Sequence, residues 1–138
     1  MPKKTPEFYS NFGSIRSRNM FYIDKTSIIK YVQFGRVLLI IRQRRCGKSL
    51  AISTIDCYFN IIYSEEDRRR WFDGTEIADL EEMIDEDGNK LKDLRGKLPV
   101  LKMDLSELTV HNESFAESFH LMVDDALDVY KTVINLKR

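Results

Sequence analysis

The stretch that decides the fold is Val37-Leu38-Leu39-Ile40-Ile41-Arg42-Gln43-Arg44-Arg45-Cys46-Gly47-Lys48-Ser49. Its first part, residues 37–41, is an unbroken apolar run rich in β-branched side chains. Such a run is typical of a strand that is buried on both faces, as in a parallel sheet covered by helices. The basic residues 42–47 predict a loop. A well-buried helix with more than one apolar face is then predicted from Lys48 to about Ile62.

Strand and helix patterns alternate on both sides of this stretch, which predicts an α/β fold of three layers with a mostly parallel sheet. Residues 1–18 predict an irregular arm, although its apolar side chains could dock on a core. The arm's apolar residues are Phe8, Tyr9, Phe12 and Ile15. Further strands are predicted at 20–23 and 99–105, further helices at 25–33, 65–72, 77–84 and 112–136, and a turn at 85–90. The predicted helix caps are Asp24, Ser64 and either Asn112 or Ser114. In the helix predicted at 65–72, Trp71 and Phe72 are predicted to lie in the core.

Composition and charge narrow the class of protein. The chain has 138 residues, with 22 Lys and Arg against 22 Asp and Glu, so the total charge does not indicate a strongly basic nucleic-acid binder. Basic residues concentrate in 1–48 and acidic ones in 76–93, a pattern that either suits an anionic ligand or only keeps the surface solvated. The two cysteines lack the spacing of a metal site or disulfide framework. No apolar run predicts a membrane span, so we expect an intracellular protein, cytoplasmic or nuclear.

The loop has the residue types that bind phosphate. A phosphate group needs converging backbone N–H donors and a cation, which a loop between a strand and a helix N-terminus supplies. The predicted site residues are Arg45, Cys46, Gly47, Lys48 and Ser49. Lys48 would reach the outer phosphates, and Ser49 would offer its hydroxyl to Mg²⁺. Arg42 occupies the place of the first glycine of the full pattern, so the match is partial, and a plain surface loop is the competing interpretation.

Other chemically capable residues have simpler interpretations beside the functional ones. The loop arginines could bind phosphate or nucleic acid, or form a solvated basic turn. They are Arg42, Arg44 and Arg45. Asp104 ends a predicted strand like a metal-binding aspartate, but a cap of the next turn explains it as well. His111 and His120 lack partners at metal-ligand spacing. The run 68–70 predicts a solvated helix face.

Three ordered segments together resemble a known family. They are Phe21-Tyr22-Ile23-Asp24-Lys25-Thr26, residues 42–49, and Leu98-Pro99-Val100-Leu101-Lys102-Met103-Asp104-Leu105-Ser106. Their order and spacing resemble the AAA-ATPase-like domain that is often joined to a PD-(D/E)XK nuclease-like region. The resemblance covers about Phe12 to Asp128 and implies a P-loop NTPase-like fold. An arginine in place of the first loop glycine is usual there, and the departures at Gln43 and Cys46 are small.

The resemblance implies a module that binds ATP and Mg²⁺. The family's catalytic acidic strand has no counterpart here and would lie beyond Arg138, so hydrolysis by this chain alone is not expected. We therefore expect the N-terminal part of a larger domain over residues 19–138, as a fragment, a truncated product or a degenerate copy. One alternative is a non-catalytic module that binds nucleic acid or protein through the basic loop. Another is a remnant without biochemical function.

Overall fold

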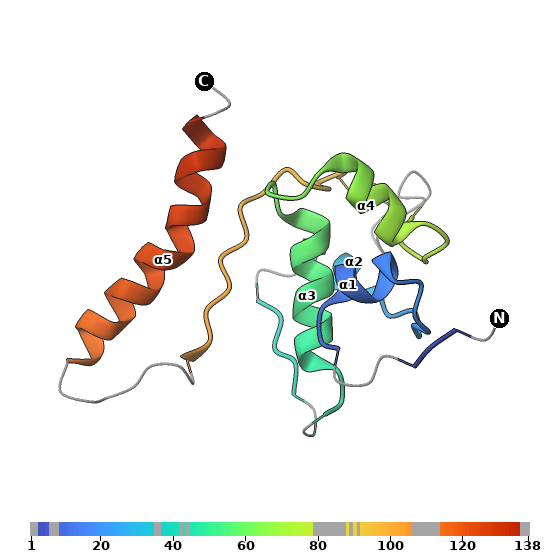
Figure 1. The fold of residues 1–138 in the computed structure, drawn as a ribbon, viewed down its shortest axis with the longest axis horizontal. Helices are drawn as coiled ribbons and strands as arrows, with labels where there is room; N and C mark the ends of the chain where they lie inside the picture. Colours follow the sequence, from blue (N-terminus) through green and yellow to red (C-terminus); the bar gives the residue numbers. More distant parts are fainter. Residues whose placement is uncertain are drawn as a thin grey trace. The chain divides into compact units, whose positions relative to one another are not determined.

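The computed structural model describes residues 3–5, 9–34, 37–41, 43, 45–78, 88, 90, 92–105 and 114–135. The chain forms two compact units, Met1–Leu98 and Pro99–Arg138. The helices of the first unit are α1 (Phe12–Ser17), α2 (Ile28–Phe34), α3 (Lys48–Phe59) and α4 (Glu65–Phe72), and the second unit contains α5 (Phe115–Asn135). Figure 1 labels these helices.

The predicted α/β fold with a mostly parallel sheet is wrong. Across the described residues the secondary structure is helical, and none of the three predicted strands forms. The β-type pairing found there includes an isolated parallel bridge between Asn60 and Leu98. It is closed by two hydrogen bonds, from the Leu98 N–H to the Phe59 carbonyl (3.0 Å) and from the Ile61 N–H to the Leu98 carbonyl (3.0 Å).

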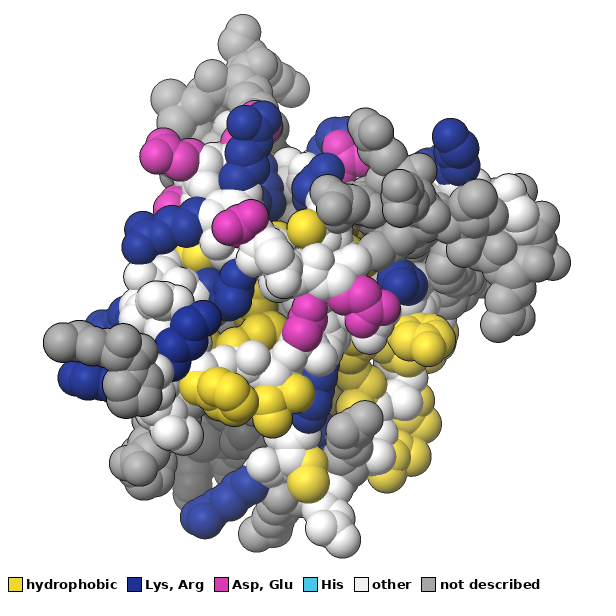
Figure 2. Space-filling model, turned by 90° about the vertical axis from the view of Figure 1, so that its right-hand side faces the viewer, with side chains coloured by type: hydrophobic (Ala, Val, Ile, Leu, Met, Phe, Trp, Pro, Cys, Tyr) yellow, Lys and Arg dark blue, Asp and Glu magenta, His cyan; other side chains and the backbone are white. Residues whose placement is uncertain are grey.

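The apolar runs that predicted strands are exposed instead of buried. In the run 37–41, Val37, Leu39 and Ile41 are 88%, 78% and 82% exposed. A strand needs a neighbouring backbone to pair its N–H and C=O groups, and an apolar run does not supply that neighbour. Leu101, Met103 and Leu105 of the run 99–105 are exposed as well. Apolar side chains accordingly reach the surface among Lys and Arg side chains (Figure 2).

The core of the first unit is an aromatic cluster between α1, α3 and α4. The ring of Phe12 lies 4.8 Å from that of Phe72 and 5.2 Å from that of Tyr22, measured between centroids. Tyr58 of α3 completes the cluster, with its ring 5.4 Å from Phe72 in an edge-to-face arrangement. Offset and edge-to-face pairs of this kind add to the stability that burial of the rings provides. Trp71 and Phe72 are both buried, which confirms their prediction as core residues.

Helix α1 lies within the segment for which the sequence predicted irregular structure. Asn11 caps it by accepting a hydrogen bond from the Ser14 N–H (2.8 Å). Phe12 and Ile15 are fully buried, so their predicted docking on the core is confirmed, whereas Tyr9 is 38% exposed and Phe8 lies outside the described residues. The Phe12 N–H donates to the Ser53 hydroxyl of α3 (2.9 Å), which ties this short helix to the centre of the unit.

Reciprocal hydrogen bonds join α1 to α4. Arg16 donates to the carbonyls of Trp71 (2.6 Å) and Asp73 (2.5 Å), which are C-terminal carbonyls without partners within α4. In return, the Trp71 indole N–H donates to the Ser17 hydroxyl (2.7 Å) and Arg70 donates to the Ser17 carbonyl (2.8 Å). These bonds hold α1 and α4 against each other, and both helices contribute aromatic side chains to the core.

A buried polar cluster holds the C-terminal end of α3. Asp56 is 1% exposed and accepts hydrogen bonds from Asn60 (2.7 Å) and from the Tyr63 hydroxyl (2.9 Å). Arg68 of α4 donates to the main-chain carbonyls of Asn60 (3.1 Å) and Tyr63 (2.5 Å). Its guanidinium group lies against Gly96. The run 68–70 is therefore only partly the solvated face that the sequence predicted.

The predicted helices are largely confirmed, with shifted ends. The helix predicted from Lys48 ends at Phe59, and it is less buried than expected, since Ile52 is 50% exposed while Ser53 and Thr54 are buried. The helix predicted at 25–33 is α2. Most of the predicted helix 77–84 and turn 85–90 lies outside the described residues.

The second unit contains the long C-terminal helix predicted at 112–136. Ser114 caps α5, because its hydroxyl accepts from the Glu117 N–H (3.3 Å) while the Glu117 carboxylate accepts from the Ser114 N–H (3.0 Å). The Tyr130 hydroxyl accepts a hydrogen bond from the Val100 N–H (2.8 Å) and donates one to the Val100 carbonyl (2.6 Å). These two bonds hold the segment around Val100 to α5. Asn112, the other predicted cap, lies outside the described residues.

Replacing Ser64 with alanine should lower the free energy of unfolding by about 1 kcal/mol, measured by urea denaturation. Its hydroxyl accepts from the Asp67 N–H (3.1 Å) and donates to the Asp67 carboxylate (2.7 Å), as the sequence predicted for a cap of α4. Ser64→Thr is the control, because a threonine hydroxyl can accept from the same N–H and donate to the same carboxylate. A loss of equal size in both variants would contradict the capping role.

Candidate functional site

The loop before α3 turns sharply where the sequence placed its glycine. Gly47 is the N-cap of α3, with φ 79° and ψ 20°, a left-handed conformation that glycine adopts without strain. Arg45 also has a positive φ, 63°. Lys48 is the first residue of α3, and the Ala51 N–H donates to the Gly47 carbonyl (2.9 Å). The predicted transition from loop to helix at Gly47-Lys48 is therefore present.

This junction leaves room for a ligand at the start of the helix. The first N–H groups of a helix have no partner within the helix. In many helices the side chain of a preceding Ser, Thr, Asp or Asn accepts a hydrogen bond from one of them. Gly47 has no side chain to do so. An anion bound in front of Gly47 could take that role, and the helix dipole would favour its charge.

The side chains of the predicted site differ in exposure. Arg45, Cys46 and Ser49 are exposed, and Lys48 is half-buried. Cys46 is a free thiol. These consecutive residues bring a guanidinium, an ammonium and a hydroxyl group to one end of α3. Arg42 and Arg44 lie outside the described residues, so a binding role for the basic loop as a whole stays a prediction.

Within the described part of the chain, cavities of three different sizes border Gly47. A cavity of about 780 Å³ is lined by Tyr9, Ser10, Arg45, Gly47, Lys48, Ser49 and Leu50, and it therefore includes the cationic and hydroxyl groups of the loop. A second cavity of about 470 Å³ lies between the loop, residues 38–41 and residues 24–31, and Lys48 borders it too. The third, of about 350 Å³, is mostly apolar. Gly47 borders all three, so groups in adjacent cavities could belong to one ligand.

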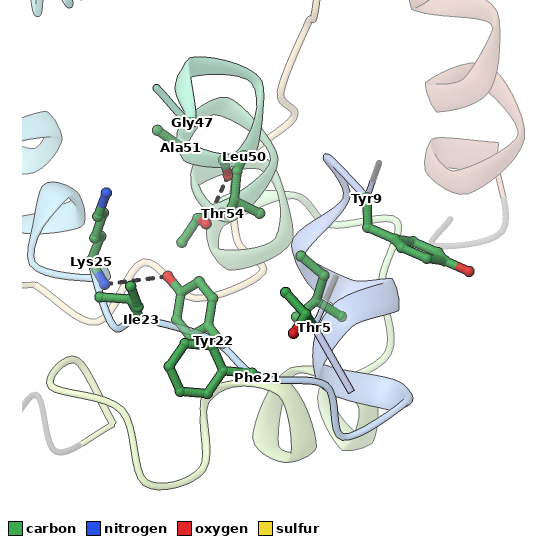
Figure 3. A pocket seen from close by; sticks show the side chains of 11 residues that line it. Thr5, Tyr9, Phe21, Tyr22, Ile23, Lys25, Gly47, Leu50, Ala51 and Thr54 are labelled. Atoms are coloured by element: carbon green, nitrogen blue, oxygen red, sulfur yellow. Dashed lines mark hydrogen bonds between the residues drawn. The ribbon is translucent and has the colours of Figure 1, made fainter. Parts of the chain in front are cut away.

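The apolar cavity lies between α3 and the segment before α2 (Figure 3). Its lining includes Phe21, Tyr22 and Ile23 on one side and Leu50 and Thr54 on the other. The Lys25 N–H donates to the Tyr22 hydroxyl (3.4 Å). Burial raises the pKa of Tyr22, although hydrogen bonds with the Lys25 N–H and with Thr54 act in the opposite direction. Tyr22 is therefore neutral at physiological pH and serves as a wall of the cavity.

Both carboxylate oxygens of Asp24 accept hydrogen bonds. One carboxylate oxygen accepts from the Thr26 N–H (2.9 Å) and hydroxyl (2.7 Å), and the other accepts from the Glu76 N–H (2.6 Å). Partial burial raises the pKa of Asp24, but these hydrogen bonds outweigh it and lower the pKa below its usual value. The sequence predicted Asp24 as the cap of a helix that begins at about Lys25, but α2 begins at Ile28, and Asp24 caps the turn that precedes it. Both of its oxygens already have partners.

The remaining candidates belong to the second compact unit or lie outside the described residues. Asp104 is exposed and belongs to the second compact unit. His120 is exposed on α5, and His111 lies outside the described residues. The sequence interpretation missed the cavity-lining residues of α3, which are Leu50, Ala51 and Thr54. They follow Gly47 at intervals of three, four and seven residues, so helical periodicity could have placed them on one face.

A family model matches most of the chain. The family model described as Predicted AAA-ATPase (AAA-ATPase_like) matches residues 8–137. No curated protein and no solved structure matches the chain. Within the described residues, no helix combines the length and the apolar character that crossing a membrane requires.

Proposed function

The chain belongs to the predicted AAA-ATPase-like family, and on that basis we propose that it binds ATP with Mg²⁺ through residues 45–49. The observation that carries the proposal is the left-handed Gly47 at the start of α3, with Lys48 and Ser49 directly after it and a cavity in front. The phosphates would accept hydrogen bonds from backbone N–H groups of the loop and from the Lys48 ammonium group.

The residues of the loop fit the proposed ligands. The cavity that includes Arg45, Lys48 and Ser49 has a volume of about 780 Å³, which suits a triphosphate, and its charged lining is cationic. Mg²⁺ prefers oxygen ligands and commonly retains several waters, so one protein hydroxyl together with phosphate oxygens is a typical set. Ser49 is exposed and supplies that hydroxyl. Bound Mg²⁺ would neutralise part of the phosphate charge.

We propose binding without hydrolysis by this chain alone. Hydrolysis requires acidic side chains that hold the metal and position water. Among the described residues, the lining of the cavity next to Ser49 includes neither Asp nor Glu. Asp24 borders the neighbouring cavity, but both of its oxygens already accept hydrogen bonds. Titration of the purified chain with ATP and Mg²⁺, with phosphate release measured in parallel, tests both parts of the proposal.

Replacing Ser49 with alanine should weaken ATP binding about tenfold in the presence of Mg²⁺, because one oxygen ligand of the ion is lost. With EDTA in place of Mg²⁺, the variant and the unmodified chain should bind ATP equally. Calorimetry under the two conditions gives both affinities. Ser49→Thr is the matched control and should bind normally, since threonine offers the same hydroxyl. A similar loss with EDTA would show that Ser49 acts on the phosphates and not on the metal.

A further inference from the structure

Another cavity with a cationic lining lies at the opposite end of α3 from the loop. Its volume is about 480 Å³, and Gly96, which borders it, donates its N–H to the Tyr58 carbonyl near the end of α3 (2.8 Å). The 12 residues of α3 span about 18 Å, so this cavity is separate from the loop at Gly47. Four basic side chains and two acidic ones border it, namely Arg68, Arg69, Arg95, Lys97, Glu65 and Asp93. The lining therefore has an excess of two positive charges.

Both acidic side chains of this lining already pair with basic ones. The Glu65 carboxylate accepts a hydrogen bond from the Arg69 guanidinium group (2.5 Å). The Asp93 carboxylate lies 3.1 Å from Nε of Arg95 and 3.4 Å from Nζ of Lys97. Burial raises the pKa of Asp93, but the hydrogen bonds from Arg95 outweigh it and lower the pKa below its usual value. Asp93 is therefore ionised at neutral pH, and its single negative charge faces two positive ones.

Arg68 is a basic side chain of this lining that has carbonyl partners. It is half-buried, and its Nη1 group donates to the carbonyls of Asn60 (3.1 Å) and Tyr63 (2.5 Å). Among the ion pairs of the described residues, none joins Arg68 to a carboxylate. Burial lowers the pKa of Arg68, and the charge of Glu65 acts in the opposite direction. A partly buried charge is stabilised by a counter-ion, and an anion in this cavity would supply one.

We propose that this cavity binds a phosphate monoester in its doubly charged form. Guanidinium groups make forked hydrogen bonds to phosphate oxygens, and the Lys97 ammonium group adds a further positive charge. A monoester dianion matches the excess of two positive charges, whereas a phosphodiester has only one negative charge. The cavity is much larger than the roughly 30 Å³ that one water molecule occupies in the liquid, so it also has room for the group that carries the phosphate.

The test is a titration of the ¹⁵N-labelled chain, followed at the backbone amides of residues 95–97. The probes are N-acetyl phosphoserine amide, sulfate and dimethyl phosphate. Phosphoserine loses its second proton near a pKa of about 6, so we expect it to bind severalfold more tightly at about pH 7.5 than at about pH 5.5. Sulfate is a dianion at both pH values and should bind equally at both. Dimethyl phosphate, with one charge, should bind at least about tenfold more weakly than phosphoserine at the higher pH.

Two pairs of variants test the lining. Lys97→Gln should weaken phosphoserine binding about tenfold, and Lys92→Gln is its matched control, because Lys92 is an exposed lysine of the same segment outside the cavity lining. Glu65→Gln should tighten binding severalfold, since it removes a negative charge and releases Arg69. Glu66→Gln is its control, because Glu66 also lies in the first turn of α4 but does not line the cavity. Lys97 and Glu65 are more than half exposed, so both variants should stay folded.

A phosphoserine peptide and glycerol phosphate distinguish the two sources of such a group. Tighter binding of the peptide would identify a phosphorylated protein segment, and tighter binding of glycerol phosphate would identify a small metabolite. Either result supports the site, provided that the amides of residues 95–97 show saturable shifts.

Several results would overturn the inference. They are the absence of saturable shifts at residues 95–97, equal binding of dimethyl phosphate and phosphoserine, and the same affinity in Glu65→Gln and Glu66→Gln. Lys48→Ala should leave the shifts at residues 95–97 unchanged, because the loop lies at the other end of α3. Loss of these shifts in Lys48→Ala would assign them to the loop and contradict a separate site. Failure of this cavity to bind phosphoserine would leave the proposed binding of ATP by the loop intact.

Discussion

Replacing Lys48 with alanine should lower the affinity for ATP and Mg²⁺ at least about a hundredfold. Lys48 lines two of the cavities that border Gly47, and in the proposed complex its ammonium group donates to phosphate oxygens. A hydrogen bond to a charged group contributes roughly 1.5–3 kcal/mol, and each 1.4 kcal/mol is a factor of ten in affinity, so one or two such bonds give this loss. Calorimetric titration measures it directly.

The Lys48→Ala variant should stay folded, because alanine is the most favourable residue in a helix. Urea denaturation of the variant checks that it is folded. Lys92→Ala is the matched control, since Lys92 is exposed and borders none of the three cavities at Gly47. Unchanged ATP affinity in Lys48→Ala would refute phosphate binding by this loop. An equal loss of affinity in Lys92→Ala would show that the effect comes from the lower net charge of the chain and not from the position of Lys48.

Replacing Gly96 with alanine should lower the free energy of unfolding by about 3 kcal/mol. Gly96 has φ 60°, which is strained for alanine, and a methyl group there would overlap the Arg68 guanidinium group. Arg68 could move away only by giving up its hydrogen bonds to the carbonyls of Asn60 and Tyr63. About 1 kcal/mol of the loss comes from the backbone, and about 2 kcal/mol from the displaced arginine.

Two further variants separate these contributions. Gly74 also has a positive φ, 64°, but a methyl group there would meet no atom within 4 Å, so Gly74→Ala should cost only about 1 kcal/mol. In an Arg68→Ala background the overlap is gone, and Gly96→Ala should then cost about as much as Gly74→Ala. Urea denaturation of the set gives the coupling energy. Additive losses in the double variant would contradict the close approach of Arg68 to Gly96.

Local signals in the sequence predicted local structure well. Ser64 followed by three acidic residues predicted the start of α4, and the buried Trp71 and Phe72 follow from its helical spacing. Gly47 followed by a helical pattern predicted the start of α3. Caps and turns depend on residues within a few positions of one another, so a single sequence contains the information that specifies them.

The sheet could not be predicted correctly, because pairing depends on segments far apart in the chain. The run 37–41 has the composition of a buried strand, yet all of its side chains except that of Ile40 are exposed and no strand forms there. The sequence of a short apolar run does not show which other segment it would pair with in a sheet. Periodicity alone therefore does not decide between a buried strand and an unpaired segment. Conversely, Phe12 lies in a Pro- and Ser-containing segment that predicted an irregular arm, and it is fully buried through contacts with Tyr22 and Phe72.

One part of the candidate site could be predicted from local sequence, and the other part could not. Residues 45–49 are consecutive, so their motif was visible in the sequence, and their placement at the end of α3 follows from it. The apolar cavity next to them is assembled from separate segments, with Tyr9, Tyr22 and Thr54 among its lining residues. No local pattern connects these residues, and only the packing of α3 against the N-terminal segments brings them together.

The most direct test of phosphate binding by the loop is a map of backbone amide chemical shifts, recorded on the ¹⁵N-labelled chain during titration with ATP and Mg²⁺. We predict saturable shifts that are largest at the amides of residues 45–49 and are absent in Lys48→Ala. Titration without saturable shifts at residues 45–49, or with the largest shifts elsewhere in the chain, would contradict the account.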